Sequence, residues 1–275
     1  MGFFLFHCKP NFDVKKQIGL SMSTMHVRTA GNRDHPTLLL IHAMGTDGRF
    51  WDECISLWKD RFYCVAPDLM AAGLSPLPDK PMGAPEHAKE IEALRCELGI
   101  ESWVAIGCAM GGAVAACHAA REPTRVTALV MANPGLRNAD AVKKILRERV
   151  ELVRAEGMAI LLPSAADRAF LNLPRDERYE CYLVRYAQQN PEGYASSVLG
   201  FLDVDIEADI TAVSCPILAL PGQHDVLMPT DSADLLRQLK PDAVIETLPN
   251  VAHFGPLQSP KVFVERVENF LSRLS

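Results

Sequence analysis

Hydrophobic residues along this chain gather in short continuous runs. Runs of this kind are typical of strands that are covered on both faces of a parallel sheet. They occur at residues 37–41, 63–66, 103–106, 126–131 and 216–220. Residues 22–28 and 243–248 predict an early strand and a last strand. Residues 1–20 have no clear period, and we expect an extension or an edge strand there.

Helix-length segments separate the runs. Residues 85–98 carry apolar side chains at helical spacing, begin with a proline and stop at Gly99, as amphipathic helices do. A final helix begins at Pro260 and places Phe263 and Val267 on one face. Strands that alternate with helices predict a mostly parallel, doubly wound α/β sheet.

The alternation breaks in the middle of the chain, where helical patterns replace strands. These patterns fill residues 139–162, 175–189 and 191–202. We therefore expect a helical cap subdomain at residues 135–209, inserted into an α/β core at residues 1–134 and 210–275. Such an insertion would lie over the carboxyl edge of the sheet, where open α/β folds bind ligands.

Composition narrows the range of partners. The chain has 275 residues, of which 48% are hydrophobic and 23% are charged, and its formal net charge is -6. No basic stretch stands out to neutralise a phosphate backbone, so a nucleic-acid partner is disfavoured. We expect a small-molecule substrate instead. The sequence leaves open whether the protein is a monomer or a homo-oligomer.

The eight cysteines are scattered and form no CxxC pair. They are typical of buried thiols in a reducing compartment and do not indicate a zinc site, so we expect neither a metal nor a cofactor. The apolar residues 3–6 are too few for a signal segment, and no run approaches the length of a membrane span. The sequence therefore predicts a cytoplasmic protein without a membrane partner.

The most informative motif is the pentad Gly107-Cys108-Ala109-Met110-Gly111, directly after an apolar run. It has the form of a GxSxG strand-to-helix elbow with alanine at the centre. In such an elbow a sharp turn lifts the central side chain above the end of the strand, and the glycines make room for the tight backbone. Ala109 therefore occupies the position of a nucleophile but has no hydroxyl group.

Acyl transfer by a hydroxyl also needs a base, an acid that orients the base, and donors for the oxyanion. His253 and Asp225 each follow a predicted strand, so both are expected on loops at the same sheet edge. The backbone N–H groups of Met110, after the apex, and Met44, in the loop after residues 37–41, are the expected oxyanion donors. These residues form the predicted catalytic site.

Each feature also has a structural interpretation. The pentad would allow tight packing of a strand against a helix. Asp225 would be a turn residue or a helix cap, and His253 would form a hydrogen bond within its loop. The three features follow one another in the order nucleophile position, acid and histidine, each at the end of a predicted strand. This combination favours the catalytic interpretation over the structural one. Cys108 is a weaker substitute nucleophile, because only the central side chain of an elbow points into the site.

Other polar residues are expected to be structural or solvent-facing. Among histidines these are His42, His118 and His224. Seven arginines of the insertion are expected mostly on solvated faces, although the planar guanidinium suits one or two of them to bind a substrate carboxylate. The seven are Arg147, Arg149, Arg154, Arg168, Arg175, Arg178 and Arg185.

With these residues, the chain resembles the α/β-hydrolase superfamily over residues 22–274, and most of all its 3-oxoadipate enol-lactonase-like branch. The residues that carry the resemblance are 44–52, 57–58, 62, 68, 73–75, 110–112, 190–194 and 216–229. The resemblance implies the α/β-hydrolase fold, a helical lid over a Ser-His-Asp site, and hydrolysis of a lactone, ester or similar acyl compound in aromatic or heterocyclic catabolism. Cleavage of C–C or amide bonds remains an alternative.

The chain departs from the superfamily pattern at three places. Residues 68–73 replace a glycine-rich DxxGxG segment, and Ala43 stands where a glycine is usual, so we expect a reshaped oxyanion loop and pocket rim. The third departure, Ala109, has two interpretations. An engineered nucleophile-knockout variant of a serine enzyme explains why Asp225 and His253 are intact, and we favour it. A natural pseudoenzyme, which binds a ligand or uses His253 without a covalent step, is the alternative.

Overall fold

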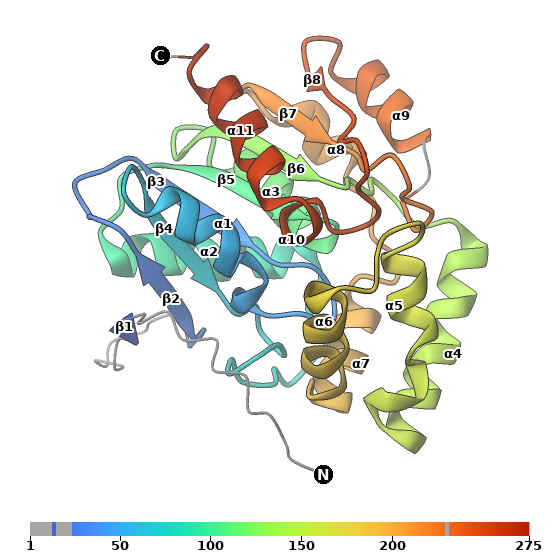
Figure 1. Cartoon of the computed structure of the whole chain (residues 1–275). Coiled ribbons are helices and arrows are strands. Elements are labelled where there is room, and N and C mark those ends of the chain that lie inside the picture. The colour runs from blue at the N-terminus through green and yellow to red at the C-terminus, as the bar shows by residue number, and fades with distance from the viewer. Residues whose placement is uncertain (1–12, 15–23, 229–230, 275) are drawn as a thin grey trace.

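A computed structural model describes residues 13–14, 24–228 and 231–274 (Figure 1). The described strands form one sheet in the order β1-β2-β4-β3-β5-β6-β7-β8. Strands β3 to β8 pair in parallel, whereas β1 and β2 form an antiparallel edge. The strands are β1 (Asp13–Val14), β2 (Val27–Ala30), β3 (Thr37–Ile41), β4 (Tyr63–Pro67), β5 (Trp103–Cys108), β6 (Val126–Ala132), β7 (Ile217–Leu220) and β8 (Val244–Ile245). The predicted mostly parallel α/β sheet is confirmed.

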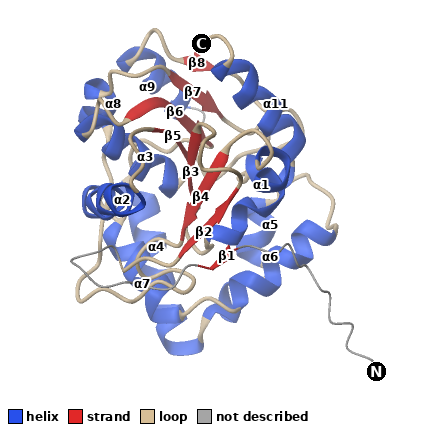
Figure 2. Ribbon diagram, turned by 90° about the vertical axis from the view of Figure 1, so that its left-hand side faces the viewer, coloured by secondary structure: helices blue, strands red, loops and turns tan. Residues whose placement is uncertain are grey.

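Helices cover both faces of this sheet (Figure 2). One face carries η1 (Gly48–Trp51), α1 (Asp52–Trp58), α10 (Gly255–Gln258) and α11 (Pro260–Leu271). The other carries α2 (Ala84–Leu98), α3 (Met110–Arg121), α8 (Glu207–Ala212) and α9 (Asp231–Leu239). Side chains of β3 alternate between the two cores: Leu38 and Leu40 enter one, and Leu39 and Ile41 the other. A strand buried on both faces has no polar side, which explains its continuous apolar run.

A group of helices follows β6 and lies beside one end of the sheet (Figure 1). It comprises α4 (Asp140–Glu156), η2 (Met158–Leu161), α5 (Ser164–Ala169), α6 (Glu177–Ala187) and α7 (Pro191–Gly200). The predicted helical stretches are confirmed, and α5 is an addition because six residues are too few for a readable period. The division of the chain into a core and a cap subdomain stays a prediction.

The early strand predicted at residues 22–28 is wrong in its position. The observed strand, β2, begins at Val27 and pairs antiparallel with β4. His26, the residue before β2, uses its backbone groups to bind the loop of residues 68–75 and not a neighbouring strand. Its N–H donates to Ser75 Oγ (2.8 Å), and its C=O accepts from the N–H of Asp68 (2.8 Å). Residues 22 and 23 lie outside the described part of the chain.

The predicted last strand is shorter than expected. Only Val244 and Ile245 form β8, although the N–H of Glu246 still donates to the C=O of Ala219 (3.0 Å). Of residues 1–20, only β1 lies within the described residues, where it is an edge strand. The rest of that prediction falls outside them.

The cysteines that the structure describes are all free thiols, and Cys8 lies outside this part of the chain. Across residues 24–228 and 231–274, every helix is too short or too polar to pass through a bilayer. The cytoplasmic location stays a prediction.

Two fully covered histidines make the fold sensitive to acid. His87 stacks on Phe201 with ring centroids 5.7 Å apart, and His118 Nε2 accepts a hydrogen bond from Trp103 Nε1 (3.0 Å). Burial lowers the pKa of each histidine from 6.5 to about 4. The unfolded chain therefore binds protons between these values that the folded chain does not.

We expect stability to be complete above the unfolded pKa and to fall as the pH drops from 6.5 towards 4. Each histidine would contribute a loss on the order of 3 kcal/mol. His87→Phe keeps the stacking shape and removes one titration, so urea unfolding at about pH 7.5 and about pH 4.5 should give a smaller difference in this variant. Equal acid losses in both proteins would contradict the assignment.

Candidate active site

The turn between β5 and α3 has the geometry of a strand-to-helix elbow. Ala109 stands alone between the two elements with φ 49° and ψ -113°, a conformation that L residues seldom adopt. Its N–H donates to the C=O of Ala132 at the end of β6 (2.9 Å). Such strain costs about 1–3 kcal/mol and persists only where the surroundings impose it.

The two outer glycines of the pentad are required by close backbone approaches. A Cβ on Gly107 would lie 2.1 Å from the C=O oxygen of Gly111, and a Cβ on Gly111 would lie 2.3 Å from that of Ile41. Any side chain at either position would push the helix away from the sheet. The pentad is therefore fixed by packing at both ends, while Ala109 at its centre faces a cavity.

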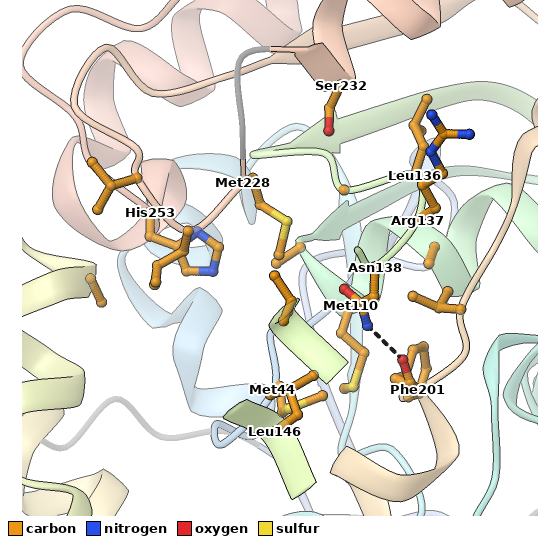
Figure 3. A pocket seen from close by; sticks show the side chains of 18 of the residues that line it. Met44, Met110, Leu136, Arg137, Asn138, Leu146, Phe201, Met228, Ser232 and His253 are labelled. Atoms are coloured by element: carbon orange, nitrogen blue, oxygen red, sulfur yellow. Dashed lines mark hydrogen bonds between the residues drawn. The ribbon is translucent and has the colours of Figure 1, made fainter. Parts of the chain in front are cut away.

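His253 and Asp225, predicted from separate loops, lie together in the structure. His253 Nδ1 is 3.1 Å from both carboxylate oxygens of Asp225. The backbone N–H of His253 donates to the C=O of Ala169 in α5 (3.1 Å), and its ring packs on Phe254. Because Nδ1 faces the acid, Nε2 is left for the cavity into which the ring points (Figure 3).

The carboxylate of Asp225 is held in its ionised form. Burial alone would raise its pKa, but the facing His253 imidazole and hydrogen bonds outweigh this and lower the pKa below its ordinary value. Oδ1 accepts from the N–H groups of Leu227 (2.9 Å) and Met228 (3.1 Å). A buried carboxylate fixed in this way holds the imidazole in one tautomer and orientation.

Asn133 is a supporting residue that sequence reasoning missed. Its side chain donates to Asp225 Oδ2 (2.8 Å) and to the C=O of Ala252 (2.7 Å), and it accepts from the N–H of Gly255 (3.1 Å). It therefore ties the acid to the loop that carries His253. The available signal was its place directly after β6, at the strand edge where Asp225 also lies.

The predicted oxyanion donors lie at the same cavity. Met110 is the first residue of α3, and Met44 belongs to the loop after β3; both line the cavity. No hydrogen bond within the described residues takes up either N–H. A free N–H at a helix N-terminus favours negative charge.

The loop that carries Met44 is rigidly held. His42 Nε2 accepts the N–H of Leu69 (2.9 Å), which leaves Nδ1 to donate to the C=O of Ala43 (2.9 Å). Gly45 has φ 72°, and a Cβ there would lie 2.6 Å from the ring of Tyr186 in α6. The structural role predicted for His42 is confirmed. Helix α6 packs against this loop through Tyr186.

A cavity of about 600 Å³ joins these groups. Its wall includes Ala109, Met44, Met110 and His253, together with side chains of α4 to α7. Figure 3 places His253 on one side and Phe201 on the other, with Met228 and Met110 between them. A largely apolar cavity with few polar groups suits a small organic ligand.

The remaining candidates lie outside this arrangement or at its edge. Cys108 is fully buried, which raises its pKa well above the ordinary value, and it does not line the cavity. His118 is buried in the core, as predicted, and His224 is half-buried. Of the seven arginines considered, Arg149 and Arg168 line the cavity.

Comparison with known proteins agrees with this fold. A family model described as alpha/beta hydrolase fold matches residues 36–157. The 3-oxoadipate enol-lactonase 2 of Acinetobacter baylyi is 24% identical over 269 residues, which are 97% of this chain and 100% of that protein.

Two solved structures are similar over most of their length. A thermophilic esterase from Thermogutta terrifontis has a TM-score of 0.83 and 25% identity, covering 91% of this chain and 93% of its own. The enol-lactonase from Burkholderia xenovorans LB400 has a TM-score of 0.84 and 22% identity, covering 90% and 96%. The chain therefore has the α/β-hydrolase fold, and it resembles 3-oxoadipate enol-lactonase-like hydrolases.

Proposed function

We propose that the serine form of this protein hydrolyses a small lactone, ester or related acyl compound, and that Ala109 stops the reaction at substrate binding. The observation that carries the proposal is the buried Asp225–His253 pair, 3.1 Å apart, beside a cavity whose wall includes Ala109. The relatives, an enol-lactonase and an esterase, support this class of reaction.

In the proposed mechanism, His253 accepts the proton of a hydroxyl at residue 109 as the oxygen attacks the acyl carbon. Asp225 stabilises the imidazolium that forms. The N–H groups of Met44 and Met110 stabilise the oxyanion, and the leaving group takes the proton from His253. Water then releases the acyl group by the same steps, with His253 again as base.

The backbone of Ala109 supports a serine origin. At φ 49° an alanine is strained, and its methyl group makes no hydrogen bond that would repay the strain. Glycine would relieve the strain, and serine would use it to aim a hydroxyl. We infer that alanine replaces a serine here and that residues 135–209 act as a cap over the site. A role in aromatic or heterocyclic catabolism stays a prediction.

The test is the variant Ala109→Ser, assayed with activated esters and small lactones. A gain of hydrolysis supports the proposal. A folded variant without any gain on esters, lactones, amides or ring-cleavage dienones would leave the pseudoenzyme, the second interpretation of Ala109, as the better account.

Asn133 gives a separate prediction within the Ala109→Ser background. Asn133→Ala frees one side of the Asp225 carboxylate, so kcat should fall by about tenfold to 100-fold while KM changes less. Asn172→Ala is the matched control. Asn133 and Asn172 both have a positive φ (50° and 60°), but Asn172 is exposed and lies between α5 and α6, away from Asp225. Steady-state kinetics of both variants check this, and equal effects would contradict a positioning role for Asn133.

A further inference from the structure

Helix α6 contacts the segment that follows Met44, and the contact lies at the carboxyl end of the helix. Arg185 and Tyr186 belong to the last turn of α6, and Gln189 follows shortly after its end. Gln189 Nε2 donates to the C=O of Arg185 (3.3 Å), so the two residues lie together. All three side chains reach residues 45–52, between β3 and the start of α1. One edge of the proposed cap therefore rests on the loop of an expected oxyanion donor.

Arg185 joins this segment to the sheet. Its Nη1 donates to the C=O of Arg49 (3.0 Å), and its Nη2 lies 3.6 Å from Asp52 Oδ2. The other oxygen of Asp52 accepts from Arg28 Nη2 in β2 (2.8 Å). The side chains of Arg185 and Asp52 are 24% and 21% exposed, and a partly buried ion pair is screened less by salt than a surface pair. The carboxylate is therefore a fixed point between α6 and the sheet.

Gln189 binds the residue that caps the next helix. Its Nε2 donates to Asp47 Oδ2 (3.2 Å), while Asp47 Oδ1 accepts from the N–H of Arg49 (3.0 Å) at the start of η1. Burial alone would raise the pKa of Asp47, but the hydrogen bonds and the charge of Arg49 outweigh this and lower the pKa. Asp47 is therefore an ionised acceptor that Gln189 and η1 share.

Tyr186 covers the residue directly after Met44. A Cβ on Gly45 would lie 2.6 Å from Tyr186 Cε2. Gly45 has φ 72°, as expected at the third position of a type II turn, and the N–H of Thr46 closes this turn on the C=O of Ala43 (3.2 Å). A shift of α6 would therefore change the packing on this turn.

The direction of the Met44 N–H follows from the same turn. The C=O of Ala43 belongs to the same peptide group as this N–H, and in a planar trans peptide the two point in opposite directions. Thr46 Oγ1 (2.7 Å) and His42 Nδ1 (2.9 Å) donate to that C=O, in addition to the N–H of Thr46. Thr46 is flanked on both sides by residues that the end of α6 contacts. The position of α6 is therefore transmitted to the direction of the N–H.

The second expected donor, the N–H of Met110, is placed by the sheet. Met110 follows the elbow, where the N–H of Ala109 donates to the C=O of Ala132 in β6 (2.9 Å) and Gly111 packs against the backbone of Ile41 in β3. The expected oxyanion site thus combines one donor set by the sheet with one set by the proposed cap.

We propose that Arg185 and Gln189 are positioning residues for the oxyanion site. They hold residues 45–52 against α6, so that the N–H of Met44 has its catalytic direction only while the proposed cap is seated. Movement of α6 to admit a substrate turns this donor away, and its return restores the donor. Neither side chain lines the cavity, so both act through the loop. The inference rests on the proposed function, because it takes the N–H of Met44 as an oxyanion donor.

Hydrogen exchange in the chain as it stands tests the hold of α6 without turnover. The N–H of Thr46 is the probe, because its bond to the C=O of Ala43 closes the turn. By NMR, its exchange should be about tenfold or more faster in Arg185→Gln and in Gln189→Ala, since a loosened segment opens that bond more often. Unchanged exchange in both folded variants would overturn the proposal.

Two variants serve as matched controls. Arg154→Gln removes the same charge and breaks an ion pair with Glu192 (2.7 Å), but that pair joins α4 to α7. Gln188→Ala changes the exposed neighbour of Gln189. Both should leave the exchange of Thr46 at its original rate, and thermal melting checks that every variant remains folded. Equal acceleration in the controls would mean general loosening and would refute a specific hold.

Kinetics in the Ala109→Ser background test the effect on the reaction. Arg185→Gln and Gln189→Ala should each lower kcat by about tenfold to 100-fold, since removal of a whole donor costs about 100-fold to 1,000-fold, while KM should change little. Arg185→Lys should recover part of the loss, because lysine keeps the charge that faces Asp52. A change in KM alone would contradict the positioning role.

A thionoester separates the oxyanion donors from a general loss of structure. Its C=S sulfur accepts hydrogen bonds weakly, so the direction of the Met44 N–H matters less than for the matching ester. The rate ratio of ester to thionoester should therefore fall in Arg185→Gln and in Gln189→Ala. Equal losses on the two substrates would count against an effect on the oxyanion site.

The outcomes separate this inference from the proposed function. If the exchange of Thr46 responds as expected but Ala109→Ser hydrolyses nothing, the hold of α6 on the Met44 loop stands and the hydrolase proposal fails. If Ala109→Ser hydrolyses esters but the variants change neither the exchange nor the rate ratio, the hydrolase proposal stands and the positioning role fails.

Discussion

Replacing Ala109 by serine should raise the hydrolysis of an accepted ester or lactone by about a million-fold over the chain as it stands, since loss of a nucleophile removes a covalent step and leaves binding in place. The elbow already has the strained backbone that serine needs, and His253 and Asp225 are paired beside it. The expected gain is in kcat, with little change in substrate affinity.

The measurement is steady-state hydrolysis of 4-nitrophenyl acetate and of small lactones, with an initial burst that reports the acyl-enzyme. Cys108→Ser is the matched control, because it adds a hydroxyl one residue earlier, where the side chain is fully buried. We expect no gain from it. Equal activity in the two variants would mean that the elbow apex is not the reactive position.

The second large effect is expected from His253 in the Ala109→Ser background. His253→Ala should cancel nearly all of the gain, because the serine hydroxyl then has no base and the imidazolium of the transition state is lost. Asp225→Asn should lose about ten-thousand-fold, since the amide favours the wrong tautomer of the imidazole. The combined His253→Ala and Asp225→Asn change should cost little more than His253→Ala alone, as groups that act together are not additive.

His224→Ala is the control for these variants, because His224 is next to Asp225 but its side chain does not line the cavity. Its kcat should stay close to that of Ala109→Ser. The pKa of Asp225 is lowered, so its carboxylate remains ionised at neutral pH, and protonation of Asp225 should not limit activity there. Full activity in His253→Ala would assign the base to another group.

The buried strands were the part of the fold that the sequence predicted best. Leu38 to Ile41 lie between two cores, so every position is apolar and the run is visible without the structure. The early strand was misplaced because the position of β2 depends on hydrogen bonds of His26 with the distant loop of residues 68–75. Such contacts leave no periodic pattern in the chain.

The candidate site also has residues that the sequence predicts and one residue that it does not. The pentad, Asp225 and His253 are recognisable because each is a local feature at the end of a strand, and parallel strands bring their ends to one edge. Asn133 was missed, because its importance lies in three hydrogen bonds to Asp225, Ala252 and Gly255. An asparagine after a strand has many other uses.

Local patterns along the chain are enough to predict the doubly wound sheet, the order of elbow, acid and histidine, and the missing hydroxyl at Ala109. These features follow from local patterns of polarity and from glycines that the backbone requires. Which arginines of the insertion line the cavity, and which form an ion pair within the described residues, becomes visible only in the folded chain. All seven look alike along the chain, because the pairing of a charged side chain depends on residues that folding brings beside it.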